Sequence, residues 1–190
     1  TMNAANGGCL GLGAAHIWKR KEYAPDDPMS DSTYRKLKLQ YIPFADKEGV
    51  RWLDTALKSV INCKEAAQHT VVADSEADIY EVVCGLVAAK TGFVIRQKED
   101  RHLNYTKSGH KLLQELALWP VQHTYTLKLP RTDKRSAHTA QMEVKWGKVC
   151  LARPKSGVVK HLQPFLEVKV VEVKEMAHCV INGEAPVHWI

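Results

Sequence analysis

The segment from Thr70 to Tyr80 constrains the fold of this chain more than any other. Its β-branched pair Val71-Val72 predicts a short buried strand, and the chain reaches Asp74 directly before an expected helix. Ser75, with an acidic residue three positions later, is similar to a capping box and predicts the start of that helix. The expected helix carries an apolar stripe at helical spacing, formed by Ile79, Val82, Val83, Leu86 and Val87.

Asp74 should therefore lie at the carboxyl end of a strand, on the rim of a sheet, where α/β proteins place their chemistry. A lone carboxylate at such a position is also a common structural or solvated group. Geometry by itself favours the structural interpretation, and the functional one needs a further signal.

Size and composition indicate an ordinary globular protein. The chain has 190 residues, of which 45% are hydrophobic and 25% charged, enough for one core plus an appended or inserted module. The longest apolar runs are far shorter than a membrane span, and residues 3–8 lack the pattern of a signal peptide. Five scattered cysteines predict buried thiols in a reducing cytosol rather than a structural zinc site. We therefore expect a cytoplasmic protein that contacts no membrane.

Positive charge is concentrated in one part of the chain. The formal net charge is +6, but residues 96–174 hold 16 Lys and Arg against 7 Asp and Glu, a net of +9. The remaining residues hold 11 against 14, a net of −3. A basic half predicts a surface that faces a polyanion, and a solvated lysine-rich sheet face is the alternative.

Several elements are expected before Asp74. Residues 10–18 follow a glycine-rich turn and predict a strand, and residues 22–44 are typical of a linker. An amphipathic helix should begin with Asp46 as its N-cap, with Trp52 on its buried side. After Asp74, Thr91-Gly92 predicts a helix end, and residues 93–96 predict another short buried strand. This order predicts an α/β fold, either a three-layer or a ribonuclease-H-like core.

From residue 112 to residue 176 the apolar period changes to two, which is typical of strands. The alternation shifts by one between Val170 and Val171, which predicts a β-bulge. Trp119 and Trp146 are expected in the core of this part. The alternating residues are Tyr125, Leu127, Leu129, Met142, Val144, Trp146, Leu166, Val168, Val170, Val171 and Val173. The simplest organisation is an antiparallel β module inserted into the α/β core.

The sequence Asp74-Ser75-Glu76-Ala77-Asp78-Ile79-Tyr80 resembles the Asp-Arg-Glu-Ala-Asp-Ile-Tyr signature of bacterial DDE transposases. This cut-and-paste group is the insertion-sequence-four family, which includes the transposase of the kanamycin-resistance transposon. Six of the seven positions match, with Ser75 in place of arginine. Four further segments are similar to segments of the family: residues 12–20, 47–53, 93–98 and 185–190.

The resemblance implies a partial ribonuclease-H-like catalytic core over residues 1–96. It also implies an inserted antiparallel β subdomain over residues 97–185. Residues 186–190 would then begin the strand that returns to the core. The expected localisation becomes the bacterial cytoplasm, in association with the nucleoid.

The same resemblance assigns roles to four residues, and Arg101 is expected to bind DNA with them. Asp74 falls on the second acid of the catalytic triad and would bind a catalytic metal ion, Mg²⁺ or Mn²⁺. Arg96 falls on an arginine that contacts the phosphate near the scissile bond, Lys98 on the lysine after it, and Arg101 extends this basic segment. Trp189 falls on a tryptophan that holds a flipped base. The implied partner is the double-stranded DNA of transposon ends, bound by a dimer of the full-length protein.

The departures from the family define what this chain lacks. The first catalytic aspartate of the family precedes the strand expected at residues 10–18. Its glutamate lies in a Tyr-x2-Arg-x3-Glu helix, and none of the six tyrosines here has arginine three residues later. We therefore expect the middle of a longer transposase, with one triad acid of three and no activity alone. Two alternatives stay open: a non-catalytic DNA- or RNA-binding module, and a metal-dependent nuclease of similar fold.

Overall fold

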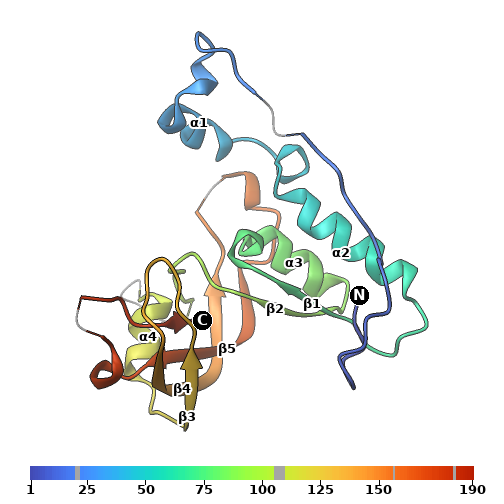
Figure 1. The fold of residues 1–190 in the computed structure, drawn as a ribbon. Coiled ribbons are helices and arrows are strands. Elements are labelled where there is room, and N and C mark those ends of the chain that lie inside the picture. Colours follow the sequence, from blue (N-terminus) through green and yellow to red (C-terminus); the bar gives the residue numbers. More distant parts are fainter. Residues whose placement is uncertain (20–21, 105–109, 156, 182) are drawn as a thin grey trace. The chain divides into compact units, whose positions relative to one another are not determined.

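The computed structural model describes residues 1–19, 22–104, 110–155, 157–181 and 183–190 (Figure 1). The fold is mixed α/β, with a two-stranded parallel sheet and a four-stranded antiparallel sheet. The chain divides into two compact units. The first comprises Thr1–Ile95 with Pro154–Gln163, and the second comprises Arg96–Arg153 with Pro164–Ile190. Within the described ranges, no helix combines the length and the apolar character that crossing a membrane requires.

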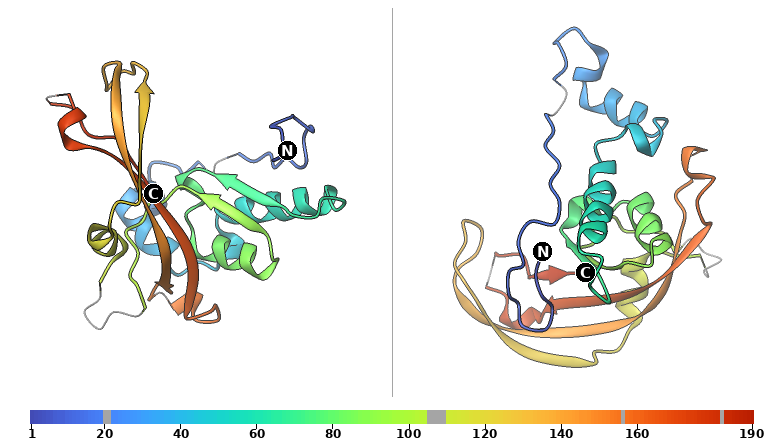
Figure 2. Two further views of the ribbon diagram at one scale, coloured as in Figure 1. Left: turned by 90° about the horizontal axis from the view of Figure 1, so that it is seen from below. Right: turned by 90° about the vertical axis from the view of Figure 1, so that its right-hand side faces the viewer.

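The first unit is built on the parallel pair β1 (Thr70–Ala73) and β2 (Gly92–Ile95), with Ala73 opposite Ile95 at its carboxyl end. Helices α2 (Val50–Asn62) and α3 (Tyr80–Ala88) cover one face of this pair (Figure 2). The core between these elements contains Ala56, Val82 and Leu86, with Trp52, Leu53, Val71, Ile79, Phe93 and Ile95 packed against them. Trp52 is thus on the buried side of α2, as predicted.

The second face of the parallel pair is open, so the prediction of two buried strands is wrong. Val72 and Val94 lie opposite each other in the register and expose 76% and 60% of their surface. Neighbouring side chains along a strand point to opposite faces, and α2 and α3 pack on only one of them.

Helix α2 begins later than the sequence predicts. Its N-cap is Gly49, and Asp46 lies in a preceding 3₁₀ helix, Phe44–Asp46. The Asp46 N–H donates to the Pro43 carbonyl at 3.1 Å, so this backbone closes a turn instead of opening the helix. Gly49 fits closely against Ile79, the residue before α3, since a Cβ at Gly49 would lie 2.6 Å from Ile79 Cδ1.

Helix α3 ends in a Schellman motif centred on Lys90, whose φ is 54°. The Thr91 N–H donates to the Leu86 carbonyl, and the Lys90 N–H donates to the Val87 carbonyl, both at 3.0 Å. The helix end was predicted at Thr91-Gly92, but Gly92 already belongs to β2. The left-handed position is therefore held by a lysine.

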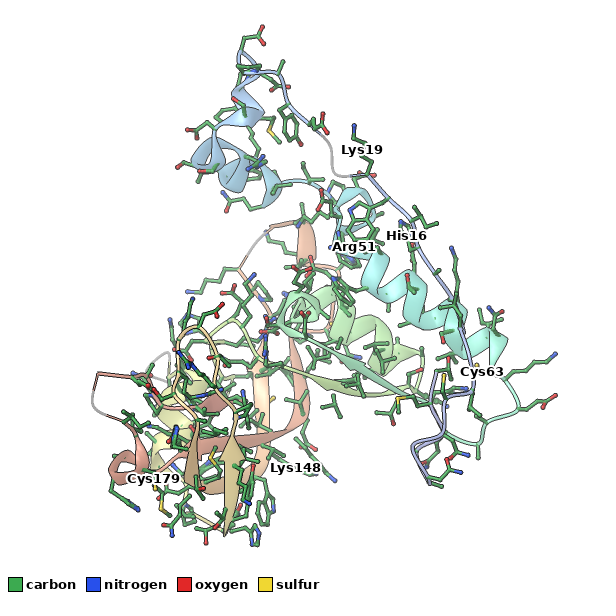
Figure 3. The ribbon with its side chains drawn as sticks, in the orientation of Figure 1. His16, Lys19, Arg51, Cys63, Lys148 and Cys179 are labelled. Atoms are coloured by element: carbon green, nitrogen blue, oxygen red, sulfur yellow. The ribbon has the colours of Figure 1, made fainter. Side chains whose placement is uncertain are left out.

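The N-terminal segment forms no strand over residues 10–18, contrary to the prediction, and instead extends along α2 (Figure 1). Asn62 Nδ2 donates to the Gly13 carbonyl at 2.7 Å. The Arg51 guanidinium carbon lies 3.9 Å from the centre of the Trp18 ring, and Arg51 faces the segment that carries His16 (Figure 3). Side chains of α2 therefore hold this segment, and no backbone ladder does.

The region expected to be a linker contains two helical elements. A 3₁₀ helix spans Pro28–Ser30, and α1 spans Ser32–Leu39. Asp31 caps α1, because its carboxylate accepts from the Tyr34 N–H at 2.6 Å. The aspartates and the proline that indicate a linker act here as helix-start signals.

The β4–β5 connection also belongs to the first unit. It contains a 3₁₀ helix, Gly157–Val159, and the Val159 side chain is buried. The Tyr80 hydroxyl of α3 donates to the Gln163 carbonyl at 3.0 Å. This hydrogen bond ties the connection to the helix that follows Asp74.

The second unit is an antiparallel meander in the order β3-β4-β5-β6. Its strands are β3 (His123–Leu129), β4 (His138–Ala152), β5 (Phe165–Glu175) and β6 (His188–Trp189). Helix α4 (Leu112–Leu118) precedes them and was not predicted, although Leu112 and Leu116 are buried at helical spacing. The long strands β4 and β5 curve over their length (Figure 2).

The predicted β-bulge at Val170-Val171 is absent, because β4 and β5 pair without interruption from Met142↔Glu175 to Ala152↔Phe165. The face of the sheet that is covered changes instead. Helix α4 covers the face that holds Gly147 and Val170, where a Cβ at Gly147 would lie 2.9 Å from the Trp119 ring. Farther along the strands, Val187 packs on the opposite face with Leu129, Ala140 and Met142. The apolar pattern therefore shifts by one without any extra residue.

Candidate functional site

Asp74 follows β1 and lies at the carboxyl end of the parallel pair, as predicted. Its side chain is exposed, and its Oδ1 accepts a hydrogen bond from the Glu76 N–H at 3.0 Å. Asp74 thereby caps the 3₁₀ helix Ser75–Ala77. The predicted capping box at Ser75 is wrong, because α3 starts only at Tyr80 and its N-cap, Ile79, makes no side-chain cap.

The surroundings of Asp74 contain a network of ion pairs. The Arg51 guanidinium lies 3.5 Å from Glu76 Oε2 and 3.4 Å from Glu48 Oε2. Only 12% of the Arg51 side chain is exposed. Glu76 is therefore paired, and the Asp74 carboxylate is left as the solvent-facing acid at the end of β1. Arg51 joins α2, the Glu76 turn and Trp18 of the N-terminal segment.

The acidic residues of this region do not form a complete metal centre. Over the described parts of the chain, no three His, Cys, Asp or Glu side chains gather where they could hold a metal ion. Asp74 can supply one carboxylate to Mg²⁺ or Mn²⁺, which prefer oxygen ligands. Further acids would be needed to complete such a site.

The four predicted DNA-binding residues lie in the second unit. Arg96 and Lys98 follow β2 and are exposed, and Arg101 is half-buried. The Gln97 N–H donates to the Ile190 carbonyl at 2.7 Å, which brings the Arg96–Lys98 segment next to the end of β6. Trp189 lies in β6 with 39% of its surface exposed. Residues 188–189 form β6, which pairs with β5 of the antiparallel sheet through Val173↔Trp189, within the second unit.

Two buried glutamates of β5 hold β6 and the segment before it. Glu172 Oε1 accepts from His188 Nε2 at 2.8 Å, and its Oε2 lies 3.4 Å from Lys145 Nζ. Glu175 Oε1 accepts from His138 Nε2 at 2.7 Å, and its Oε2 accepts from the Val187 N–H at 3.0 Å. Sequence reasoning missed both, although each acid falls within the apolar alternation of its strand.

The His138–Glu175 pair changes the acidity of both groups. The hydrogen bond to Glu175, together with one from Nδ1 to the Ser136 carbonyl, raises the pKa of His138 above its ordinary value. Burial acts to raise the pKa of Glu175, but the Val187 N–H and His138 outweigh it and lower that pKa. Both shifts favour the charged forms, an imidazolium beside a carboxylate.

Sequence reasoning also placed Trp146 in the core, and this prediction is wrong. Trp146 exposes 47% of its surface on the sheet face that α4 does not cover, whereas Trp119 is half-buried against Gly147. The alternation correctly puts Tyr125, Met142 and Trp146 on one face. Only Met142 of the three is covered by the segment before β6.

A search of protein-family models and of curated proteins finds no match to this chain.

Proposed function

We propose that this chain is the central part of the catalytic domain of a DDE transposase, with a ribonuclease-H-like core and an antiparallel β insertion. The complete enzyme would hydrolyse and transesterify DNA phosphodiesters in cut-and-paste transposition. The observation that carries the proposal is the position of Asp74. It is an exposed acid at the carboxyl end of a parallel strand, inside a seven-residue segment that matches the family signature at six positions.

The open face of the parallel pair supports a larger core. Parallel sheets are normally covered on both faces. Here α2 and α3 cover one face, and Val72 and Val94 are exposed on the other. A ribonuclease-H-like core would supply both the additional strands beside β1 and β2 and the cover for these valines.

A catalytic metal ion would need ligands beyond those in this chain. In such enzymes a pair of divalent ions stabilises the attacking and leaving oxygens. Asp74 contributes one carboxylate, and the described residues gather no complete ligand set. The other two triad acids would come from other parts of the full-length protein, and this chain alone would not cleave DNA.

The residues of this chain would bind and orient DNA. Arg96 and Lys98 present exposed charges after β2 and would contact backbone phosphates, with Arg101 beside them. The basic stretch of residues 96–174 would contribute the salt-dependent attraction for the duplex of a transposon end. Trp189 offers an exposed ring that could hold a flipped base. Two copies of the full-length protein would assemble on the DNA, in the bacterial cytoplasm at the nucleoid.

The first test is a substitution of the candidate metal ligand in the full-length protein. Asp74→Asn should reduce strand cleavage by more than about 100-fold. Loss of an outer-shell partner of a metal typically costs about 10- to 100-fold in activity, and loss of a direct ligand should cost more. Binding to transposon-end DNA should stay unchanged. Asp78→Asn, in the same segment, is the matched control and should retain cleavage. Full cleavage by Asp74→Asn would overturn the proposal.

The genomic reading frame gives an independent test. The proposal expects an aspartate on a strand upstream of this segment and a Tyr-x2-Arg-x3-Glu helix downstream. A frame that carries neither would favour a non-catalytic nucleic-acid-binding module, for which the exposed basic segment of Arg96 and Lys98 would suffice. A metal-dependent nuclease would instead cleave DNA without joining the ends.

A further inference from the structure

The antiparallel sheet exposes aromatic and basic side chains together on the face that α4 does not cover. We call this surface the aromatic face; its residues are Tyr125, Trp146, Lys148, Lys169 and Val171. The register places Trp146 opposite Val171, which is 51% exposed, and places Lys148 opposite Lys169 in the next row. Lys148 extends outward from the sheet (Figure 3).

The backbone beneath Trp146 is fixed from two sides. The Trp146 N–H donates to Gln122 Oε1 at 2.6 Å, just before β3 begins. On the reverse face, Lys145 Nζ donates to the Leu116 carbonyl of α4 at 3.0 Å, and the Trp119 ring packs on Gly147. The indole of Trp146 is therefore presented on a rigid strand, so that a ligand would lose little free energy in ordering it.

The lysine pair indicates a polyanionic ligand. Like charges directly opposite each other on a sheet are destabilising. Lys148 Nζ lies 2.8 Å from Glu167 Oε1, but both groups are exposed, and such surface pairs contribute little. Phosphates beside Lys148 and Lys169 would relieve the repulsion. Protein interfaces are enriched in Trp and Tyr but depleted in Lys, so the combination favours a nucleic acid over a protein partner.

The exposed rings indicate which form of nucleic acid fits. Aromatic side chains on an open sheet stack on bases, but the bases of a duplex already stack on one another. We propose that the aromatic face binds unpaired nucleotides of a single strand, with Trp146 stacked on a base and Lys148 and Lys169 at phosphates. Tyr125 provides a second ring two rows away, beside His123, whose ring centre is 6.4 Å from its own.

Trp146 and Tyr125 have no role in the proposed function, although Lys148 and Lys169 belong to the basic stretch of residues 96–174 that it assigns to duplex DNA. Asp74 lies in the other unit. Trp189 lies on the same face of the sheet as Trp146, but at its β6 edge, in the row of Val173. The inference therefore does not require that the protein is a transposase, and the two proposals can fail independently.

The test measures the anisotropy of labelled oligothymidylate and of labelled oligouridylate during titration with the 190-residue chain. Trp146→Ala should weaken binding by about 5- to 150-fold, the range reported for loss of one base–aromatic stack. Trp146→Phe keeps an aromatic ring and should retain most of the affinity. That result would show that a substitution at this position leaves the sheet intact. Leu118→Ala, an exposed apolar residue of α4, is the matched control and should bind like the wild type. Comparison of the two oligonucleotides distinguishes DNA from RNA as the ligand.

A second measurement tests the lysines. The double variant Lys148→Gln, Lys169→Gln should flatten the slope of log K against log salt by about 1.4, at about 0.7 per phosphate contact on a single strand. Asp74→Asn should leave oligonucleotide binding unchanged. Equal binding by Trp146→Ala and wild type would overturn the proposal. A second result would also overturn it. If the wild type bound no oligonucleotide but self-associated in light scattering, and Trp146→Ala did not self-associate, the aromatic face would be an interface between copies of this chain.

Discussion

Lys90 shows how one residue can carry a conformational cost in this chain. Among the described residues it is the only non-glycine with a positive φ. A side chain in the left-handed region costs roughly 1–2 kcal/mol, and glycine avoids the clash. The Schellman bonds to Leu86 and Val87 hold it there and connect α3 to β2.

Lys90→Gly should therefore raise the free energy of unfolding by about 0.5–1 kcal/mol, since the entropy cost of glycine offsets part of the gain. Urea denaturation of both proteins provides the measurement. Lys58→Gly, at an exposed position inside α2, is the matched control and should lower the same free energy by about 1 kcal/mol. A loss of stability in Lys90→Gly would show that the lysine side chain contributes more than its backbone costs.

Single residues also show where sequence reasoning reaches its limit. Asp74 could be placed at the end of a strand because a β-branched pair before it and a helical stripe after it are local signals. Trp146 could not be placed on an exposed surface, because alternation tells which residues share a face and not which face is covered. Lys90 could not be identified as the helix end, since nothing in the composition marks a lysine for the left-handed position.

At the scale of elements, the His138–Glu175 pair joins β4 to β5 and anchors the segment before β6. Because the pKa of His138 is raised from 6.5, its contribution to stability is complete below pH 6.5 and is lost as the pH rises through the raised value. Because the pKa of Glu175 is lowered from 4.5, its contribution is complete above pH 4.5 and is lost as the pH falls through the lowered value. The pair stabilises most between these two ordinary values.

The unfolding temperature of the second unit should therefore be highest at mildly acidic pH and fall as the pH rises past the pKa of His138. Thermal unfolding followed by circular dichroism between pH 5 and pH 8 checks this profile. His138→Gln should flatten the decline, and His178→Gln, at an exposed position, should leave it unchanged. An equal decline in His138→Gln would assign the pH dependence to another group.

Elements with strong local periodicity were predictable, and elements defined by distant contacts were not. Helices α2 and α3 have apolar stripes, and strands β3 to β5 have a period of two. Residues 10–18 have strand-like composition, but their contacts are side chains of α2 such as Asn62 and Arg51. The shift at Val170-Val171 has the appearance of a bulge in one strand. Its cause is that α4 covers one face of the sheet near Gly147, whereas the segment of Val187 covers the opposite face near Met142. The sequence of a single strand does not show which segment covers which face.

At the scale of the molecule, the chain forms two compact units and passes from one to the other three times, after residues 95, 153 and 163. The first unit holds the parallel pair with α2 and α3, and the second holds the antiparallel sheet with α4. Each has buried apolar residues of its own, Leu86 and Val82 in the first, and Met142 and Ala140 in the second. Units with separate cores often unfold in separate steps.

Calorimetry of the wild type should therefore show two transitions. Lys90→Gly should raise the midpoint of one, because the substitution lies in the first unit. His138→Gln should lower the midpoint of the other at pH 6, because the pair lies in the second. A single transition that both substitutions shift would show that the two units unfold as one cooperative body.

The hydrogen bond between Gln97 and Ile190 has a consequence for the history of the chain. It places the two ends of residues 97–190 side by side. Segments with adjacent ends can be inserted or lost as a block during evolution. Removal of residues 97–190 would nevertheless change the first unit, because their β4–β5 connection supplies the Gln163 carbonyl that accepts from the Tyr80 hydroxyl. An ancestor without residues 97–190 would lack the Gln163 carbonyl as an acceptor for the Tyr80 hydroxyl. We expect phenylalanine at the position of Tyr80 in any relative that lacks the antiparallel sheet.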